Sequence, residues 1–178
     1  MIDTSVQKGG VPGISGCVEH IAVVTQLIKE AKEGKKDLVV LWLDLANAYG
    51  SVPHKLLEAS MKSYHVPQRV IKLVTTYYGN FYVRHTVGDK QTRWQRLEKG
   101  IVAGCTISVI LFTAAMNLLV KTAEKECRGP KTKSGIRQPP IRAIMDDLTT
   151  TVPSIVGTRW ILRGLEDGIT WARMVFKP

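Results

Sequence analysis

Three aspartates are the residues whose type and spacing could support metal-dependent chemistry. Asp44 ends the apolar run from Leu38 to Leu43, and Asp146 and Asp147 stand side by side far downstream. A carboxylate at the end of an apolar strand is costly to desolvate unless a cation, a metal or solvent meets it. Adjacent like charges repel, and a divalent metal is the natural cation to hold them close. A strand-end aspartate bonded to its own turn, or a solvated Asp-Asp turn, is the plain structural alternative for each pattern alone.

The segments around these aspartates predict strands. The run from Leu38 to Leu43 is too short for a helix and rich in strand-forming residues, which predicts a strand covered on both faces. Ile141 to Met145 and Leu148 to Val152 predict a hairpin, at whose turn both neighbouring carboxylates can stay near one sheet edge. The remaining apolar periodicity predicts helices from Cys17 to Lys32, from Ser51 and Pro53 to Tyr64, from Pro67 to Gly79, from about Ser108 to Lys125, and from Gly157 to Met174.

The segment before the long apolar helix carries a glycine, Gly104. A glycine there lets the backbone approach a ligand closely, and the unpaired amides of a first helical turn favour anions such as phosphates. A glycine needed only for the turn is equally compatible with the pattern. The uncharged stretch from Ile101 to Val120 has the length of a membrane span. Its internal polar residues and its symmetric flanks, Lys99 and Lys121, favour a core helix instead.

Composition favours an acidic partner. The 178 residues carry a formal net charge of +10 at pH 7, which is typical of proteins that meet nucleic acid or an anionic surface. The 3 cysteines, odd in number and far apart, favour reduced thiols in an intracellular protein. A predicted hairpin, Phe81 to Val87 and Gln91 to Leu97 around a Gly88-Asp89-Lys90 turn, is a candidate nucleic-acid-binding surface. Its basic residues are Arg84, Lys90, Arg93 and Arg96, and a second basic loop runs from Lys131 to Arg142.

In combination and in order, these pieces resemble the palm of a reverse transcriptase, an RNA-directed DNA polymerase. LWLDLANAYGSVPH is similar to the family's first catalytic motif, GIVAGCTISVILF to its glycine-containing motif, and AIMDDL to its Asp-Asp hairpin. These motifs are most similar to those of non-LTR (LINE-like) retrotransposon polymerases. QKGGVPGISGCVEH also resembles the segment that precedes the first catalytic strand in that group. The resemblance implies an α/β (α+β) palm, in which helices back an antiparallel, ferredoxin-like sheet built from the Asp44 strand, the Asp-Asp hairpin and the chain end.

The resemblance also implies a two-metal nucleotidyl transfer. Two Mg²⁺ ions, or Mn²⁺ as a substitute, would be held by the catalytic residues Asp44 and Asp146, with Asp147 as a supporting catalytic ligand. The Leu45 carbonyl would add an oxygen, and Tyr49 would collide with a ribose 2′-hydroxyl and so favour deoxynucleotides. The implied nucleotide-binding residues are Ala48, Tyr49, Gly104 and Ser108. The implied partners are an RNA template, a DNA primer and deoxynucleoside triphosphates, with no membrane.

The chain departs from the family pattern at two positions. Gly50 stands where the family often has a second aspartate, and Ala103 stands where it often has a glutamine. Lys177 is a candidate for a role at the leaving phosphate. We expect residues 1–178 to form a single partial reverse transcriptase domain, with fingers strands and a thumb supplied by other parts of a parent polyprotein and with a nuclear location. A catalytically inactive nucleic-acid-binding remnant, which would use the basic hairpin and need no carboxylates, is the alternative.

Overall fold

A three-stranded antiparallel sheet forms the centre of the chain in the computed structural model, which describes residues 2–14 and 16–177. Its strands are β1 (Val39–Leu43), β6 (Ile141–Ile144) and β7 (Asp147–Val152), in the order β1-β7-β6. Leu43 lies opposite Leu148, and Ile144 lies opposite Asp147. The predicted hairpin around the two adjacent aspartates is therefore confirmed, and its second strand is the one that pairs with β1.

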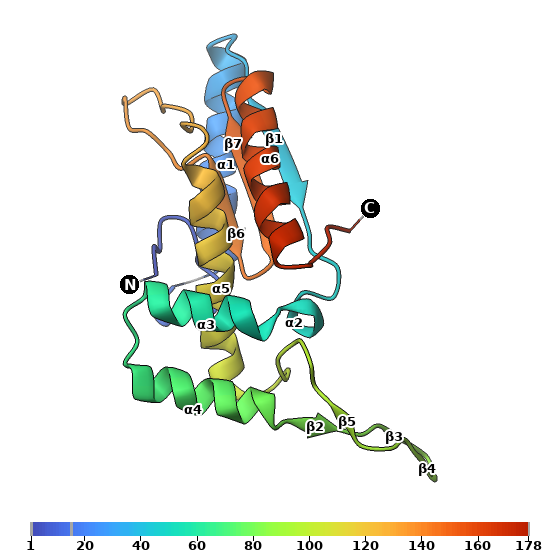
Figure 1. Ribbon diagram of the computed structural model, residues 1–178. Coiled ribbons are helices and arrows are strands. Elements are labelled where there is room, and N and C mark those ends of the chain that lie inside the picture. Colours follow the sequence, from blue (N-terminus) through green and yellow to red (C-terminus); the bar gives the residue numbers. More distant parts are fainter. Residues whose placement is uncertain (1, 15, 178) are drawn as a thin grey trace.

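Helices cover both faces of this sheet (Figure 1). Helices α5 (Thr106–Glu124) and α6 (Ile155–Trp171) pack on one face, where their side chains bury the alternate strand residues that point toward them. Helix α1 (Cys17–Glu33) lies over the other face. The first of these layers contains Val120, Ala123, Ile141, Ala143, Leu148, Val152, Ile161 and Leu165. Successive strand side chains alternate between the two faces of the sheet. The strand residues between those of this core therefore point toward α1.

A second core surrounds the amino-terminal half of α5. Helices α3 (His54–Ser63) and α4 (Gln68–Gly79) pack beside it, and the two cores meet along α5. Within the described residues, α5 is the one helix long and apolar enough to cross a membrane, but most of that stretch is buried between α3, α6 and β6. The apolar run around Ile101 to Val120 thus serves as the core helix of this fold.

The chain end joins the sheet beside β1. Leu45 forms an antiparallel bridge with Phe176. The Ala46 N–H donates to the Val175 carbonyl at 2.8 Å, and the Lys177 N–H donates to the Asp44 carbonyl at 2.9 Å. The resulting order, chain end, β1, β7, β6, is the ferredoxin-like order that was expected. The chain end therefore takes part in the sheet as expected, and among the described residues it does so through a single bridge and not through a strand.

Strand β1 differs from the prediction in its burial. It is the edge strand of the three-stranded sheet, and Trp42 is 71% exposed, so the strand is not covered on both faces. A run of apolar residues cannot reveal this, because an exposed tryptophan and a buried one look alike in sequence. The short helix α2 (Ala48–Ser51) was also not predicted. The other predicted helices agree with the structure to within about three residues at each end.

The basic hairpin is present in two short pieces. Strand β2 (Tyr82–Val83) pairs with β5 (Gln95–Arg96), and β3 (Thr86–Val87) pairs with β4 (Lys90–Gln91). The turn is two residues long, Gly88 and Asp89, and Gly88 has a φ of 56°, which is the backbone region that a tight hairpin turn requires. Lys90 therefore begins a strand and is not part of the turn. The hairpin projects from the helical body at the lower right of Figure 1.

Candidate functional site

The sheet brings the three predicted aspartates to one end. Asp44 directly follows β1, Asp147 is the first residue of β7, and Asp146 lies in the turn between β6 and β7. Because Leu43 pairs with Leu148, the next positions along the two strands are Asp44 and Asp147. They share the face that α1 covers, since Leu43 and Leu148 pack toward the opposite core. Antiparallel pairing thus places together carboxylates that are far apart in the sequence.

Asp146 carries the electrostatic signature of a crowded acidic site. Burial raises the pKa of its carboxyl group, and the nearby charges of Asp147 and Asp44 raise it further. A bond from its own backbone amide and the charge of Lys177 act in the opposite direction. Tyr49 is close enough that Asp146 contributes to its raised pKa, after burial. The arrangement disfavours a third negative charge and so favours any cation that enters.

Lys177 supplies the cation in this structure. Its ammonium group forms an ion pair with an Asp44 carboxylate oxygen, while its backbone is held by the bond to the Asp44 carbonyl. The hydrogen bond to Asp44 and the charge of Asp44 raise the pKa of Lys177, and Asp146 and Asp147 add to the effect. The sequence could not reveal this pairing, because it depends on the chain end lying beside β1.

The carboxylates fit a hard divalent cation in their chemistry. Magnesium prefers oxygen ligands, and the charges of Asp147 and Asp44, which add to the effect of burial on the raised pKa of Asp146, would attract a cation. Among the described residues, however, no group of three or more acidic, histidine or cysteine side chains is gathered closely enough to ligate one ion. Mutual repulsion of the three carboxylates opposes a closer approach, and Lys177 forms its ion pair with Asp44.

Replacing Lys177 by methionine is expected to strengthen Mn²⁺ binding about two- to fivefold at neutral pH, the range of an exposed ion pair. Asp44 loses its competing cation, and the positive charge that opposes metal entry is removed. The Lys177 charge lowers the pKa of Asp146, so its removal should also move the loss of binding on acidification to a higher pH. Calorimetric titration across pH checks both effects, with Lys125→Met at the exposed end of α5 as the control. Unchanged affinity would show that Lys177 does not compete with the metal.

Tyr49 is held beside this site by the second core. Its ring stacks on Phe112 of α5 with the ring centroids 4.3 Å apart and an interplanar angle of 16°. Phe112 is fully buried, and the Tyr49 carbonyl accepts a bond from the Ile101 N–H at 2.8 Å. The neighbouring Ala48 is buried in the same core. Tyr49 therefore has a fixed orientation close to Asp146, while Ala48 serves to pack α2.

The two positions predicted near the start of α5 differ in access. Gly104 is exposed and has a φ of 87°, a conformation that a residue with a side chain rarely adopts. Open space surrounds the position that a Cβ would occupy there, so backbone access to a ligand remains available. Ser108 is instead fully buried, and its hydroxyl lies 3.0 Å from the Tyr78 hydroxyl. This position gives the Ser108 side chain a packing role and no open path to a nucleotide.

Gly50, the departure from the family pattern, lies in α2 and in close contact with the loop that contains Gly100. The Cβ position of Gly100 would be 2.7 Å from the Gly50 carbonyl oxygen. A Cβ on Gly50 itself would be 2.5 Å from a side-chain atom of Asn47. Any larger residue at position 50 would therefore require the Asn47 side chain to move.

A groove of about 480 Å³ runs between α1 and the sheet face beneath it. It reaches Asp44 and Asp147 and is also lined by Trp42 and His20. The His20 ring is buried, and desolvation, followed by the positive charges of Arg142 and Lys8, lowers its pKa to about 4. His20 is therefore neutral at physiological pH and adds no charge to the acidic end of the groove.

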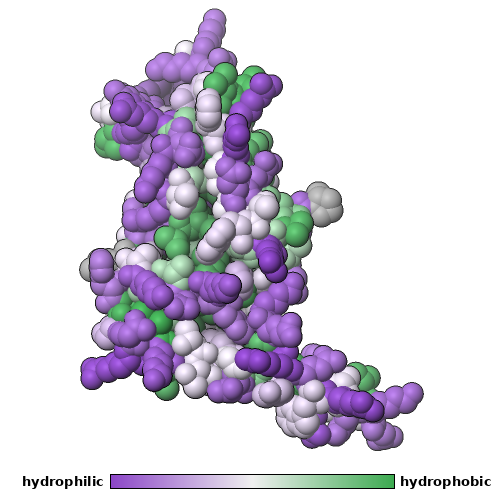
Figure 2. All heavy atoms as spheres, viewed as in Figure 1, coloured by the Kyte–Doolittle hydropathy of each residue, from purple (hydrophilic) through white to green (hydrophobic). Residues whose placement is uncertain are grey.

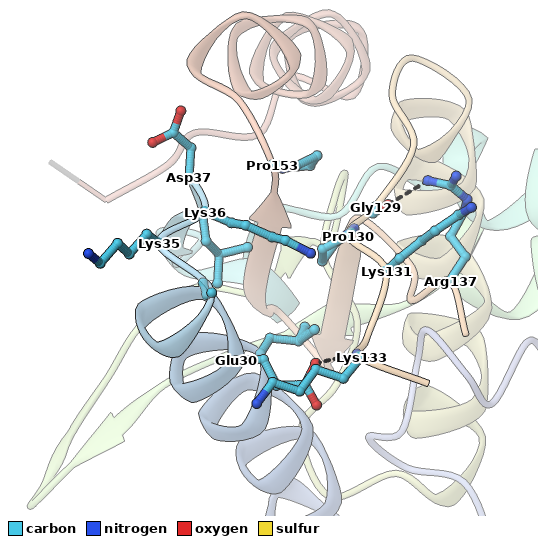
Figure 3. A pocket seen from close by; sticks show the side chains of 14 residues that line it. Glu30, Lys35, Lys36, Asp37, Gly129, Pro130, Lys131, Lys133, Arg137 and Pro153 are labelled. Atoms are coloured by element: carbon cyan, nitrogen blue, oxygen red, sulfur yellow. Dashed lines mark hydrogen bonds between the residues drawn. The ribbon is translucent and has the colours of Figure 1, made fainter. Parts of the chain in front are cut away.

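A larger hollow, of about 580 Å³, lies away from the carboxylates (Figure 3). It is lined by Leu38 and Pro153, which flank β1 and β7 at the ends opposite to Asp44 and Asp147. In Figure 3, Lys36 reaches across the hollow toward Pro130. Its position at the far end of the strands separates it from the candidate metal site.

The basic hairpin forms an exposed cationic surface. Arg84, Lys90, Arg93 and Arg96 are all exposed, and the hairpin is mostly hydrophilic in Figure 2. Arg96 also donates from its Nε to the Gly79 carbonyl at 2.9 Å, which ties the hairpin to α4. The sequence analysis missed Trp94, which is 62% exposed and lies with its ring centroid 4.9 Å from the Arg84 Cζ. The available signal in the sequence was an aromatic residue, Trp94, between the basic residues Arg93 and Arg96.

The second predicted basic surface, Lys131 to Arg142, is only partly free. Arg142 is buried and donates to the Pro139 carbonyl, the Thr151 hydroxyl and Gln138. Lys133 forms an ion pair with Glu33 of α1. The expectation that this whole range is a nucleic-acid surface was therefore wrong at Arg142, because the strand β6 carries that residue beneath α1.

Comparison with known proteins identifies the family of this chain. Residues 6–178 match the family described as "Reverse transcriptase (RNA-dependent DNA polymerase)". The chain is 26% identical over 106 residues to the "Retrovirus-related Pol polyprotein from type-1 retrotransposable element R2" of Nasonia vitripennis, covering 60% of this chain and 10% of that protein. It is 24% identical over 161 residues to the type-2 R2DM polyprotein of Drosophila melanogaster, covering 88% and 14%.

Solved structures show the same fold at low sequence identity. Apo telomerase from Candida tropicalis, truncated from its C-terminal domain, superposes with a TM-score of 0.63 at 11% identity over 90% of this chain and 35% of that one. Telomerase from Candida albicans, in complex with a fragment of telomeric RNA, gives 0.52 at 10% identity, over 90% and 30%. The family match spans nearly the whole chain, the fold is the expected palm, and the chain is a member of the reverse transcriptase family, homologous to R2 retrotransposon polyproteins.

Proposed function

We propose that this chain is the palm of an RNA-templated DNA polymerase and that Asp44, Asp146 and Asp147 form its metal site. The observation that carries the proposal is the convergence of the three carboxylates at one end of the sheet, with a raised pKa at Asp146 and a lysine drawn to Asp44. The chain spans 10% and 14% of the two R2 relatives described above. The template, primer and nucleotide partners are therefore proposed for this chain from its family.

The proposed roles divide among the aspartates. Asp44 and Asp146 would hold two Mg²⁺ or Mn²⁺ ions, with Asp147 and the Leu45 carbonyl as further oxygen ligands. Metals held there would supply positive charge against the negative charge that develops on the attacking primer hydroxyl and on the leaving pyrophosphate. Lys177 pairs with Asp44 in this structure, and a metal on Asp44 would free its ammonium group for a role near the leaving phosphate. The contribution of the aspartates is negative charge where the cations would bind, and that of Lys177 is positive charge near the leaving phosphate, where negative charge develops.

Tyr49 is proposed as the residue that excludes ribonucleotides. Its stack on Phe112 fixes the ring beside Asp146, so the ring cannot move aside for a 2′-hydroxyl without losing that contact. Exclusion by a rigid aromatic ring gives selectivity through a clash and needs no added attraction for the deoxynucleotide. Gly104 is proposed to let its backbone approach the nucleotide or the template.

The basic hairpin is proposed to bind the nucleic-acid backbone. Changing Arg84, Lys90 and Arg93 together to glutamine is expected to lower the slope of log affinity against log salt by about 2 for a single strand, since each lost phosphate contact removes about 0.7. Arg96 stays unchanged because it bonds to Gly79. Fluorescence anisotropy with a labelled RNA oligonucleotide, titrated at several salt concentrations, measures the slope.

A matched control for charge is the triple change of Lys29, Lys32 and Lys125 to glutamine. These lysines are exposed on α1 and at the end of α5. The control is expected to leave the slope nearly unchanged. Equal loss in both triple variants would show that RNA responds to net charge alone and that the hairpin is no specific surface.

Primer extension tests the proposed activity directly. The wild-type chain is incubated with an RNA template, a DNA primer, deoxynucleotides and Mg²⁺, and Mn²⁺ binding is followed in parallel by calorimetry. Extension that depends on metal supports the polymerase. RNA binding without metal binding or extension, by a chain that is folded, would favour the inactive nucleic-acid-binding remnant instead.

A further inference from the structure

Gln7 forms a clamp on the turn that carries the adjacent aspartates. Its side chain is fully buried although it is polar. Nε2 donates to the Met145 carbonyl at 3.1 Å, and Oε1 accepts from the Met145 N–H at 3.0 Å and from the Gly9 N–H at 2.9 Å. The Gln7 side chain thus provides hydrogen-bond partners for both the N–H and the carbonyl of Met145, which is far away in the sequence. Buried polar groups need such partners.

Met145 needs such support because of its backbone conformation. Its φ of 59° lies in the left-handed region, which is unfavourable for a residue with a long side chain. Residues in that region persist only when the surrounding structure holds them there. Since Asp146 follows directly, the direction of its carboxylate depends on how firmly Met145 keeps this conformation.

The segment around Gln7 is shaped to fit against this turn. The Lys8 N–H donates to the Ala143 carbonyl at 3.0 Å, so the segment runs beside β6. A Cβ on Gly9 would lie 2.3 Å from the Met145 nitrogen, a distance that no side chain tolerates. Thr113 of α5 adds a bond from its hydroxyl to the Gly9 carbonyl at 3.3 Å. Only glycine at position 9 lets the segment approach closely enough for Gln7 to reach Met145.

We propose that Gln7 is a positioning residue that holds the left-handed Met145 turn and thereby sets the geometry of Asp146 and Asp147. Gln7 touches neither carboxylate and acts through the backbone of Met145. Its effect on catalysis rests on the proposed polymerase function. Its effect on the turn does not, which allows the two to be tested separately.

Hydrogen exchange at the Met145 amide is the first readout, measured by NMR on the whole chain. Gln7→Leu removes all three hydrogen bonds and should speed exchange at Met145 roughly tenfold, the factor that corresponds to one or two lost hydrogen bonds. Core amides of α5, such as that of Met116, should not change. Gln26→Leu is the matched control, because the Gln26 side chain is exposed and bonds only to Glu30 among the described residues.

Gln7→Glu provides the graded variant. Its carboxylate still accepts from the Met145 and Gly9 amides but no longer donates to the Met145 carbonyl. Exchange at Met145 should therefore lie between the wild-type and Gln7→Leu rates, and Mn²⁺ affinity should fall roughly tenfold in Gln7→Leu, which adds no charge near the aspartates. Should Gln7→Leu fail to fold, Gln7→Glu decides alone, through faster exchange at Met145 with unchanged α5 amides.

Two results would overturn the clamp. One is wild-type exchange at Met145 in every folded variant, and the other is exchange that rises equally at Met145 and in α5, which marks general destabilisation. A wild-type chain that binds no Mn²⁺ and extends no primer, while Gln7→Leu still frees Met145, would reject the polymerase proposal and leave the clamp in place.

Discussion

Asp146→Asn is expected to lower RNA-templated primer extension about 10³-fold. A metal ligand contributes several kcal/mol of transition-state stabilisation, and about 1.4 kcal/mol corresponds to each tenfold change in rate. The change keeps the shape of the side chain and removes its charge, so the loss should appear in Mn²⁺ affinity as well. Single-turnover extension and calorimetry measure the two effects.

Stability should move in the opposite direction. The raised pKa of Asp146 shows that the folded chain disfavours its ionised form, so without metal the asparagine variant should unfold at an equal or higher urea concentration at pH 7. In the wild type, metal binding should weaken as the pH falls through this raised pKa, because protonation removes the ligand. For an unperturbed aspartate, the same loss would occur at a lower pH.

Asp167→Asn provides the control for this experiment. Asp167 is exposed on α6, and its replacement should change neither metal binding nor extension. Retention of full activity by Asp146→Asn would contradict the proposed metal site. A variant that is unfolded without urea would contradict the predicted equal or higher stability.

Phe112→Ala is expected to reduce the free energy of unfolding by about 3 to 5 kcal/mol, the range for truncating a buried aromatic ring. Phe112 is 0% exposed and lies in the core that joins α5 to α3 and α4. The cavity would also remove the stacking partner of Tyr49, whose centroid lies 4.3 Å away. Urea denaturation followed by circular dichroism measures the loss.

Two further variants separate packing from chemistry. Ile110→Ala lies on the same helix but is 58% exposed, and should cost no more than about 0.5 kcal/mol. Phe112→Leu keeps most of the buried volume but not the stack, so it should fold and should discriminate less between deoxynucleotides and ribonucleotides. Unchanged discrimination in a folded Phe112→Leu variant would show that Tyr49 is oriented by other contacts.

Much of the fold was determined by local sequence. The helical periods of α1, α3, α4, α5 and α6 and the hairpin of β6 and β7 were predicted with nearly correct limits. Apolar periodicity, proline and glycine determine where helices, strands and turns begin and end through effects that extend over a few residues. A single chain segment is therefore sufficient to predict those limits. The short α2 escaped because four residues hold too little periodicity to be recognised.

The identities of the candidate site residues were likewise visible in the sequence. Asp44, Asp146 and Asp147 stand at strand ends, and the motifs around them resemble one family strongly enough to imply their association. The order of the motifs also implied the ferredoxin-like sheet. These inferences need the types and order of residues, and no knowledge of distances.

The tertiary structure decided how those residues are surrounded. Only the antiparallel order shows that β1 is an edge strand with Trp42 exposed, that Arg142 is buried, and that Lys177 lies against Asp44. Gln7 and Met145, which are separated by 138 positions, meet through the same long-range packing. Burial, ion pairing and pKa depend on neighbours contributed by distant segments, and a local sequence pattern contains no information about which segments those are.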